Sequence, residues 1–441
     1  MPAGRVTRQQ KGQAVESTVT SEPRPGYGQL LRTPHALSFV LPGFLARQPF
    51  AMLTMSIVLL LRHTTGSFAT AGTVAAVAGV AMALFAPQSG RLADRFGQRA
   101  VLLPGVAVHT GSLVALAALA LADAPIWALI GTAAVVGASV PQIGPMVRAR
   151  WATALDRPDR RHLMPTAAAL ESVTDEFTFV VGPLLATALC TFVHPGAGLG
   201  AEAVLTLVGG LLFATRRDTQ PTALGASDRH ARVAHVSAMS VAGVRVLAVA
   251  FLGIGAVFGG MQVSLTAFAE EAGQPGVNGL LYGIFAAGNM LSGIVFGAVA
   301  WKTAPRNRLL IGYSALALTA STLWTVHSVA LFAVVGLLVG MCIAPALVTG
   351  FTLIESLVPA SARTEAFTWL TGAVALGQAG AVTLSGGLAD ARGASAGFLV
   401  PMAGTALALV VLLSLRGSLR PASAGRTVAR GVRHRPGVTV D

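Results

Sequence analysis

The chain has 441 residues, of which 54% are hydrophobic and only 11% are charged, and its mean hydropathy is +0.68. Soluble globular proteins carry about 25% charged residues, so this composition argues against a soluble enzyme, a nucleic-acid-binding domain and a disordered chain. The 31 Lys and Arg residues exceed the 18 Asp and Glu residues and give a formal charge of +13. The positions of these cations along the chain decide what the charge means.

Twelve apolar runs follow one another after a polar segment, residues 1–35, which is predicted to be a cytoplasmic tail. Each run is long enough to cross a bilayer core of about 30 Å. The first six lie at about 36–61, 68–89, 100–122, 125–146, 164–191 and 198–214. The second six lie at about 246–268, 278–300, 309–325, 328–354, 365–388 and 396–415.

The grouping of these runs predicts an all-α integral membrane protein with twelve transmembrane helices in two six-helix bundles, 36–214 and 246–415. A polar stretch, 215–245, is predicted to be a cytoplasmic linker between the bundles, and 416–441 a basic cytoplasmic tail. The runs show no alternation of period two, which excludes a membrane β-barrel.

The cations are distributed very unequally between the two sides of the predicted membrane. If both termini share one side, 28 of the 31 cations lie there, whereas the opposite side holds Arg62 and Arg392, and Arg47 lies inside the first run. Cytoplasmic loops carry an excess of Lys and Arg, so both termini are predicted to be cytoplasmic. The arginine-rich, lysine-poor usage indicates a bacterial inner membrane protein, and no nucleic acid partner is expected.

The two halves carry a repeated pattern in equivalent places. Gly90, Arg95, Arg99 and Gly105 flank the connection after the second run, and an offset of 207 leads to Gly297, Lys302, Arg306 and Gly312 after the eighth. Four matches at one offset favour a duplication, which is a frequent design among transporters that bind substrate between repeats.

A motif after the second run resembles the signature of a known family. Residues 90–99 read G-R-L-A-D-R-F-G-Q-R, and the residues of interest are Gly90, Asp94, Arg95, Gly97 and Arg99. Gly90 permits close helix approach, Asp94 can cap a helix or pair with a cation, and Gly97 permits a tight turn. The segment resembles the G-x-x-x-D-R-x-G-x-R/K signature of the major facilitator superfamily.

The resemblance covers about residues 36–415 and implies two six-helix bundles, a central cavity and alternating access by rocking of the halves. It also implies that Asp94, Arg95 and Arg99 latch the cytoplasmic side in the outward-open state. The copy after the eighth run has Trp301 in place of the aspartate, so a second latch of equal strength is not expected there.

The fifth run contains Gly182-Pro183, which is similar to the core of a motif found in drug:proton antiporters of this family. The resemblance implies a bend in the fifth helix, because proline removes a backbone hydrogen bond. It favours export over import, although the glycines that usually flank the motif are absent.

Four ionisable residues lie within two of the apolar runs: Arg47 in the first, and Glu171, Asp175 and Glu176 in the fifth. An ionisable group inside a membrane is costly and indicates a functional site by default. We expect Arg47 to pair with Asp175, and Glu171 or Glu176 to take up and release a coupling proton, because burial favours the neutral acid. The alternative is a static salt-bridge network that positions the first and fifth helices.

Uncharged polar residues inside the runs are candidates for lining the cavity, although hydrogen bonds between helices explain them equally well. They are Gln48, Gln142, Gln262, Asn289 and Gln378. No H-E-x-x-H or G-x-x-x-x-G-K sequence occurs, and no cofactor or metal site is expected.

Together these features predict a secondary active transporter, monomeric in the lipid bilayer, with a small-molecule substrate and protons as its partners. Proton-coupled efflux of drugs or secondary metabolites is the preferred interpretation. A proton-linked importer of a sugar or similar metabolite is the alternative. A membrane-embedded enzyme, a channel and a non-transporting sensor are more remote.

Overall fold

The computed structural model describes residues 27–221, 238–299, 301–358 and 363–420, and within them every regular element is a helix. The amino-terminal half contains α1 (Tyr27–Leu31), α2 (Ala36–Thr65), α3 (Phe68–Phe96), α4 (Gln98–Leu121), α5 (Ile126–Ser139), α6 (Ile143–Ala154), α7 (Met164–Phe192) and α8 (Ala197–Thr215). The carboxyl-terminal half contains α9 (Ala242–Glu271), α10 (Val277–Ala298), α11 (Pro305–Ala320), α12 (Val329–Leu357), α13 (Arg363–Arg392), α14 (Ala394–Gly397) and α15 (Leu399–Ser414).

Eleven of these segments are long and apolar enough to cross a membrane within the described part of the chain. Two of them combine neighbouring helices, since α5 and α6 form one span, Ile126–Ala154, and α14 and α15 form another, Ala394–Ser414. The twelfth predicted helix is α11, which has 16 residues and packs between α12 and α15. The predicted all-helical fold of about twelve spanning helices is therefore confirmed.

Several helices extend beyond the apolar runs that predicted them. The run at 68–89 becomes α3, which continues to Phe96, so Gly90, Asp94 and Arg95 lie in its last two turns rather than in a loop. Gly97 alone, with φ 88°, forms the turn into α4. A backbone of this kind favours glycine, and the prediction of a tight turn at Gly97 agrees with the geometry.

The fourth span differs most from its predicted form. It breaks at residues 140–142, and α6 then carries Arg148 and Arg150, which the charge count had placed in a cytoplasmic loop. Arg150 is fully buried because its guanidinium donates to the Gln98 side chain at 2.9 Å and the Arg216 carbonyl at 3.0 Å, and lies 3.6 Å from the Phe213 ring centroid. Protein partners hold this cation.

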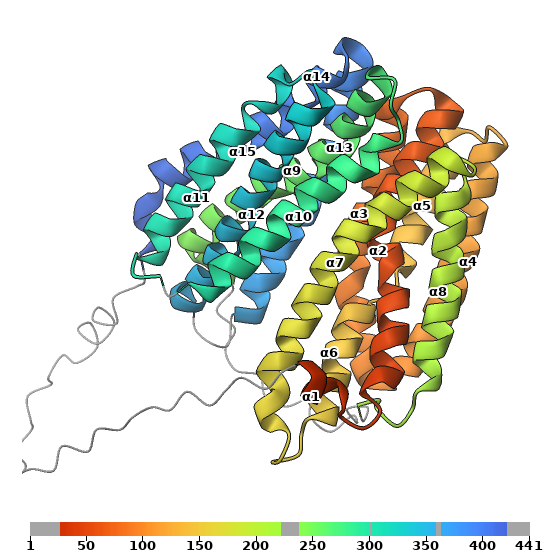
Figure 1. The fold of residues 1–441 in the computed structure, drawn as a ribbon, viewed down its shortest axis with the longest axis vertical. Helices are drawn as coiled ribbons and strands as arrows, with labels where there is room; N and C mark the ends of the chain where they lie inside the picture. The colour runs from red at the N-terminus through yellow and green to blue at the C-terminus, as the bar shows by residue number, and fades with distance from the viewer. Residues whose placement is uncertain (1–26, 222–237, 300, 359–362, 421–441) are drawn as a thin grey trace, which may run out of the picture.

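The two halves meet mainly through two pairs of helices, α3 on α13 and α7 on α10, with smaller contacts of α2 and α3 on α9. Figure 1 shows them in contact near α14 and diverging toward the end that carries α1. We call the end with Gly97 and residues 155–163, 216–221 and 301–304 the basic side. The opposite end, with the turns at 66–67, 122–125, 193–196, 272–276 and 321–328, is the far side.

Candidate functional site

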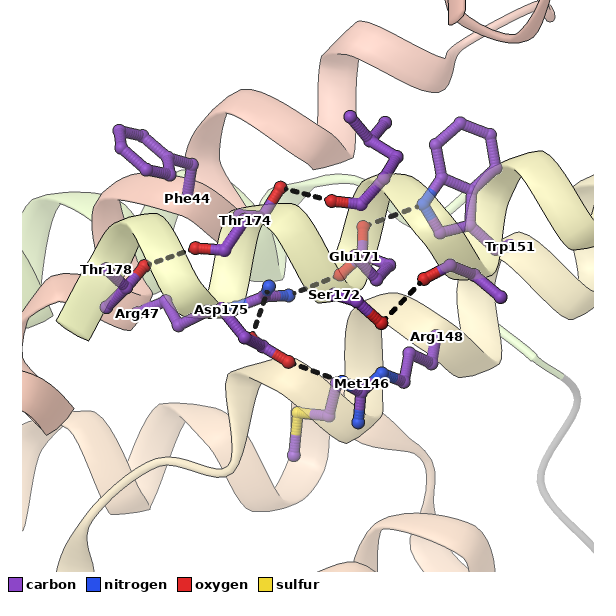
Figure 2. A network of polar contacts seen from close by, with 12 residues as sticks. Phe44, Arg47, Met146, Arg148, Trp151, Glu171, Ser172, Thr174, Asp175 and Thr178 are labelled. Carbon is purple, nitrogen blue, oxygen red and sulfur yellow. Dashed lines mark hydrogen bonds and ion pairs between the residues drawn. The ribbon is translucent and has the colours of Figure 1, made fainter. Parts of the chain in front are cut away.

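Four charged residues from three helices form an ion-pair network in the amino-terminal half (Figure 2). Arg47 of α2 donates from Nη1 to Asp175 Oδ1 at 2.8 Å and from Nη2 to Glu171 Oε2 at 2.6 Å. Glu171 and Asp175 lie one turn apart on α7 and so share a face of that helix. The sequence predicted one carboxylate partner for Arg47, whereas the structure brings two.

The Glu171 end of the network is closed to solvent, with only 2% of the side chain exposed. Its second oxygen accepts a hydrogen bond from the Trp151 indole at 2.9 Å. Trp151 packs edge-on against Phe39 with 4.9 Å between ring centroids, inside an apolar cluster on the basic side. A buried carboxylate needs both a cation and further hydrogen bonds, and Glu171 has both.

The Asp175 end is more open, and a second cation reaches it. Asp175 forms an ion pair with Arg148 of α6 in addition to Arg47. The side chains of Asp175 and Arg148 are 29% and 53% exposed. The network therefore has two arginines for its two carboxylates, and water has access to one end of it.

The break in the fourth span brings α6 alongside this network. Pro141 has no N–H to donate to a helix, and α6 begins two residues later with Gly144 in its first turn. A Cβ on Gly144 would lie 3.8 Å from Arg47 Nε and 3.9 Å from Asp175 Oδ1. The start of α6 thus runs directly beside the ion pair.

Glu176 follows Asp175 in the sequence but faces a different helix. Its Oε2 accepts a hydrogen bond from Asn289 Nδ2 of α10 at 3.3 Å, across the contact between the halves. In the described part of the chain no Lys, Arg or His lies within 4.0 Å of its carboxylate oxygens. Of the three predicted acids, it is the one that joins the two bundles.

The remaining predicted cavity residues divide between the halves. Gln48 donates to Thr178 Oγ1 at 3.1 Å and so links α2 to α7. Gln378 donates to the Gln262 side-chain oxygen at 3.2 Å and links α13 to α9. Gln142 donates to the Val140 carbonyl within its own turn. All three hydrogen bonds stay within one half, and those of Gln48 and Gln378 connect two helices of that half.

The predicted latch residues lie at the basic-side end of α3. The side chain of Asp94 lies outside the described part of the structure. Arg95 is exposed and stacks on Phe96, with 4.9 Å from its guanidinium carbon to the ring centroid. A Cβ on Gly90 would meet no described atom within 4 Å, and Arg99 follows in the first turn of α4.

Gly182 and Pro183 lie inside α7, which is assigned as one helix from Met164 to Phe192. A Cβ on Gly182 would lie 2.7 Å from Ala51 Cβ and 3.1 Å from the Ala51 carbonyl carbon. The glycine therefore lets α7 approach the backbone of α2 closely, next to the segment that carries Arg47.

The sequence reasoning missed a second buried acid, Glu202 of α8. It is fully buried, and neither carboxylate oxygen has a hydrogen-bond partner in the described part of the chain; Ser56 of α2 faces it without a bond of normal geometry. Glu202 is the only charged residue in the run 198–214, which could have flagged it. Arg148 and Trp151 were missed because they follow the end of the apolar run.

Comparisons with known proteins agree with this architecture. The family model of the Major Facilitator Superfamily matches residues 40–329 and 279–438. No curated protein matches the sequence at a significant level. Within the described residues, no group of three or more His, Cys, Asp or Glu side chains could hold a metal ion.

Three solved transporters have similar folds at low sequence identity. A mutant of the nucleoside transporter NupG has a TM-score of 0.70 and 12% identity, covering 87% of this chain and 100% of its own. The POT family transporter PepTSo has a TM-score of 0.67 and 12% identity, covering 88% of this chain and 97% of its own. An inward-facing bacterial homologue of the iron transporter ferroportin has a TM-score of 0.65 and 18% identity, covering 86% of this chain and 98% of its own.

Proposed function

Because the chain belongs to the major facilitator superfamily, whose family model spans nearly all of it, we propose that it exports small organic molecules in exchange for protons by alternating access. The family and the transporter folds make it a multi-pass membrane transporter and not an enzyme. The direction, the substrate class and the coupling ion are the proposed part.

The proposed orientation places the basic side in the cytoplasm of a bacterium, with both termini on that side. Its support is the distribution of cations in the sequence, with 28 of 31 on one side of the spans. The turns of the far side carry acids instead, among them Asp123 and the neighbouring Glu270 and Glu271 at the end of α9.

The single observation that carries proton coupling is the contact between Glu176 and Asn289. Glu171 and Asp175 already have arginines, so an extra proton on either would break an ion pair. Glu176 has no such cation, and its hydrogen bond crosses from α7 to α10. Gain or loss of a proton there changes the charge at the contact between the halves, and a charge change at a bistable contact can shift a population.

In this proposal the Arg47 network is a rigid frame for the proton-carrying residue. It joins α2, α6 and α7 through two arginines and two carboxylates, and it fixes the face of α7 from which Glu176 projects. Asp94, Arg95 and Arg99 would latch the basic side when that side closes.

Export is supported by Gly182-Pro183, and the substrate is proposed as a drug-like or secondary metabolite. The structural neighbours are described as nucleoside, peptide and metal transporters, so a test must sample several chemistries. In inside-out vesicles with an acidic lumen, lipophilic cationic dyes, nucleosides and dipeptides are offered in turn. An exporter that exchanges substrate for protons accumulates its substrate in the lumen; accumulation only with an alkaline lumen would identify a proton-linked importer instead.

The role of Glu176 is tested with Glu176→Gln in the same vesicles. We expect gradient-driven accumulation to fall at least about tenfold, because the amide keeps the contact with Asn289 but carries no proton. Exchange of labelled for unlabelled substrate without a gradient should persist, and its rate should no longer vary with pH. Asp123→Asn, in an exposed turn of the far side, is the matched control and should behave as the parent.

Two results would contradict this assignment. If Glu176→Gln keeps full gradient-driven accumulation, the proton is carried elsewhere. If Glu171→Gln, and not Glu176→Gln, separates exchange from accumulation at normal expression, the proton-carrying residue lies in the Arg47 network.

A further inference from the structure

The end of α13 repeats the sequence of the end of α3. Residues 89–97 read S-G-R-L-A-D-R-F-G, and residues 385–393 read S-G-G-L-A-D-A-R-G, with six of nine positions identical. Gly97 and Gly393 both have φ 88°, and in each case a new helix begins at the next residue. The two segments are therefore copies of one structural motif, one on the basic side and the other on the far side.

The far-side copy forms hydrogen bonds with the start of α3, which belongs to the opposite half of the molecule. Asp390 accepts hydrogen bonds from the Ser67 hydroxyl at 2.7 Å, the Phe68 N–H at 2.9 Å and the Ala69 N–H at 2.8 Å. The first N–H groups of a helix have no partner within the helix, and the positive end of its dipole attracts a carboxylate. A side chain of α13 thus caps α3 across the contact between the halves.

The glycine of the far-side copy, Gly386, also contacts the start of α3. A Cβ on Gly386, one turn before Asp390, would lie 2.4 Å from the Phe68 carbonyl oxygen. Only glycine permits that approach, since real Cβ atoms do not come so close to a backbone oxygen. A Cβ at the same position in the basic-side copy, Gly90, would meet no described atom within 4 Å.

A second contact between the halves lies beside the capped helix. Arg62 of α2 pairs with Glu270 of α9 at 3.0 Å, and its guanidinium carbon lies 4.3 Å from the Phe68 ring centroid. These residues and Asp390 line a pocket of about 640 Å³ on the far side. The Arg62 and Glu270 side chains are 29% and 32% exposed, so this pair is in contact with solvent.

We propose that residues 385–393, together with Ser67–Ala69, form a far-side latch that holds the present conformation and opens when the basic side closes. The two copies of the segment then act in alternation, since Gly386 contacts the opposite half here and a Cβ on Gly90 would meet no described atom. The proposal takes alternating access from the proposed transport function, but it concerns only which contacts hold the halves together and needs neither a proton nor a known substrate.

The test measures the opening of each side directly in the full chain. Cys190 and Cys342 are replaced by serine, and spin labels are placed in pairs across the halves: Asp123→Cys with His327→Cys on the far side, and Asp159→Cys with Lys302→Cys on the basic side. All four positions are exposed and lie outside the latch. Distances between labels are recorded by pulsed electron paramagnetic resonance.

We expect Asp390→Ala to raise the ratio of far-side-open to far-side-closed molecules by about two- to thirtyfold, the range for loss of a helix cap. The far-side pair should lengthen and the basic-side pair should shorten together. Glu271→Ala is the matched control, because Glu271 caps α14 within its own half through the Ala394 N–H at 2.7 Å. It should leave both distance distributions unchanged.

A second variant keeps the test decisive if Asp390→Ala folds poorly. In this variant Ser67→Cys and Asp390→Cys are bridged by a short bifunctional thiosulfonate, and the labels are attached to p-acetylphenylalanine at the same four positions so that they do not compete for thiols. The bridge should fix the far-side pair at its short distance, whereas the unbridged sample should not be fixed. The proposal is overturned if folded Asp390→Ala keeps the parent distribution, or if the bridge leaves both sides free to open. If the parent shows no proton-driven accumulation but Asp390→Ala still shifts both label distances, the proposed function alone is contradicted.

Discussion

Two glutamates of the amino-terminal half are almost fully buried, and they differ in their surroundings. Glu171 has the Arg47 guanidinium on one oxygen and the Trp151 indole on the other. Glu202 is buried to the same degree, with no cation and no hydrogen-bond partner on either oxygen in the described part of the chain. Removal of one member of a buried ion pair is costly because it leaves the other charge unpaired.

The Arg47 network should therefore respond unequally to loss of its members. We expect Arg47→Ala to lower the free energy of unfolding by about 3–5 kcal/mol, and Trp151→Phe by about 1–3 kcal/mol through loss of one donor to a buried acceptor. Arg148→Ala, at the exposed end, should cost less than about 1 kcal/mol. Unfolding in mild detergent, followed by circular dichroism, measures all three; equal losses for Arg47→Ala and Arg148→Ala would contradict the burial argument.

Replacement by glutamine should affect stability very differently at Glu202 and at Glu171. Because no described cation faces it, Glu202→Gln removes no ion pair and should change the free energy of unfolding by less than about 1 kcal/mol. Glu171→Gln removes the partner of a buried arginine and should cost about 3 kcal/mol or more. If Glu202→Gln is as damaging as Glu171→Gln under the same conditions, a cation does reach Glu202.

Helix packing in this half depends on small residues as much as on charges. Gly182 brings α7 against the Ala51 backbone of α2, and a Cβ there would lie 2.7 Å from Ala51 Cβ. These are the two helices that must be in register for Arg47 to reach both Glu171 and Asp175. The apolar run predicts a spanning helix, but it does not predict which neighbour that helix contacts.

At this element scale, Gly182→Ala should be destabilising although alanine has the higher helix propensity. Overpacking costs about 1–3 kcal/mol, which exceeds the gain of up to about 1 kcal/mol from propensity. Gly200→Ala in α8 is the matched control, because its Cβ would meet nothing within 4 Å, and it should be neutral or stabilising. The comparison uses thermal unfolding of both variants; a stabilised Gly182→Ala would show that α2 and α7 are not tightly apposed.

For the molecule as a whole, the contacts between the halves are unevenly distributed. The Asp390 cap and the Arg62–Glu270 pair lie on the far side, and the Glu176–Asn289 hydrogen bond lies deeper between α7 and α10. The bundles diverge toward the basic side (Figure 1). This arrangement explains why a Cβ on Gly386 of the far-side copy would meet the opposite half, whereas one on Gly90 of the other copy would meet no described atom within 4 Å.

The sequence predicted the fold well, because two local properties relate directly to the bilayer. The length of an apolar run must match the thickness of the bilayer core, and the placement of cations sets the orientation of the helices. The sequence also singled out Arg47 and the acids of α7, since ionisable groups within apolar runs stand out, and their role in transport stays a prediction. It underestimated helix length where Arg148 and Arg150 find protein partners, because hydropathy counts an arginine as polar whether or not it is paired.

The sequence by itself determined the family, the helical architecture and the asymmetry of charge between the two sides. The tertiary structure alone decided that Arg47 pairs with two carboxylates, that Glu176 reaches the opposite half, that no described cation faces Glu202 and that Asp390 caps α3. These pairings join residues as far apart as 323 positions in the chain. They depend on which helix packs against which, and that is set by the sum of many contacts along the helices rather than by any local pattern.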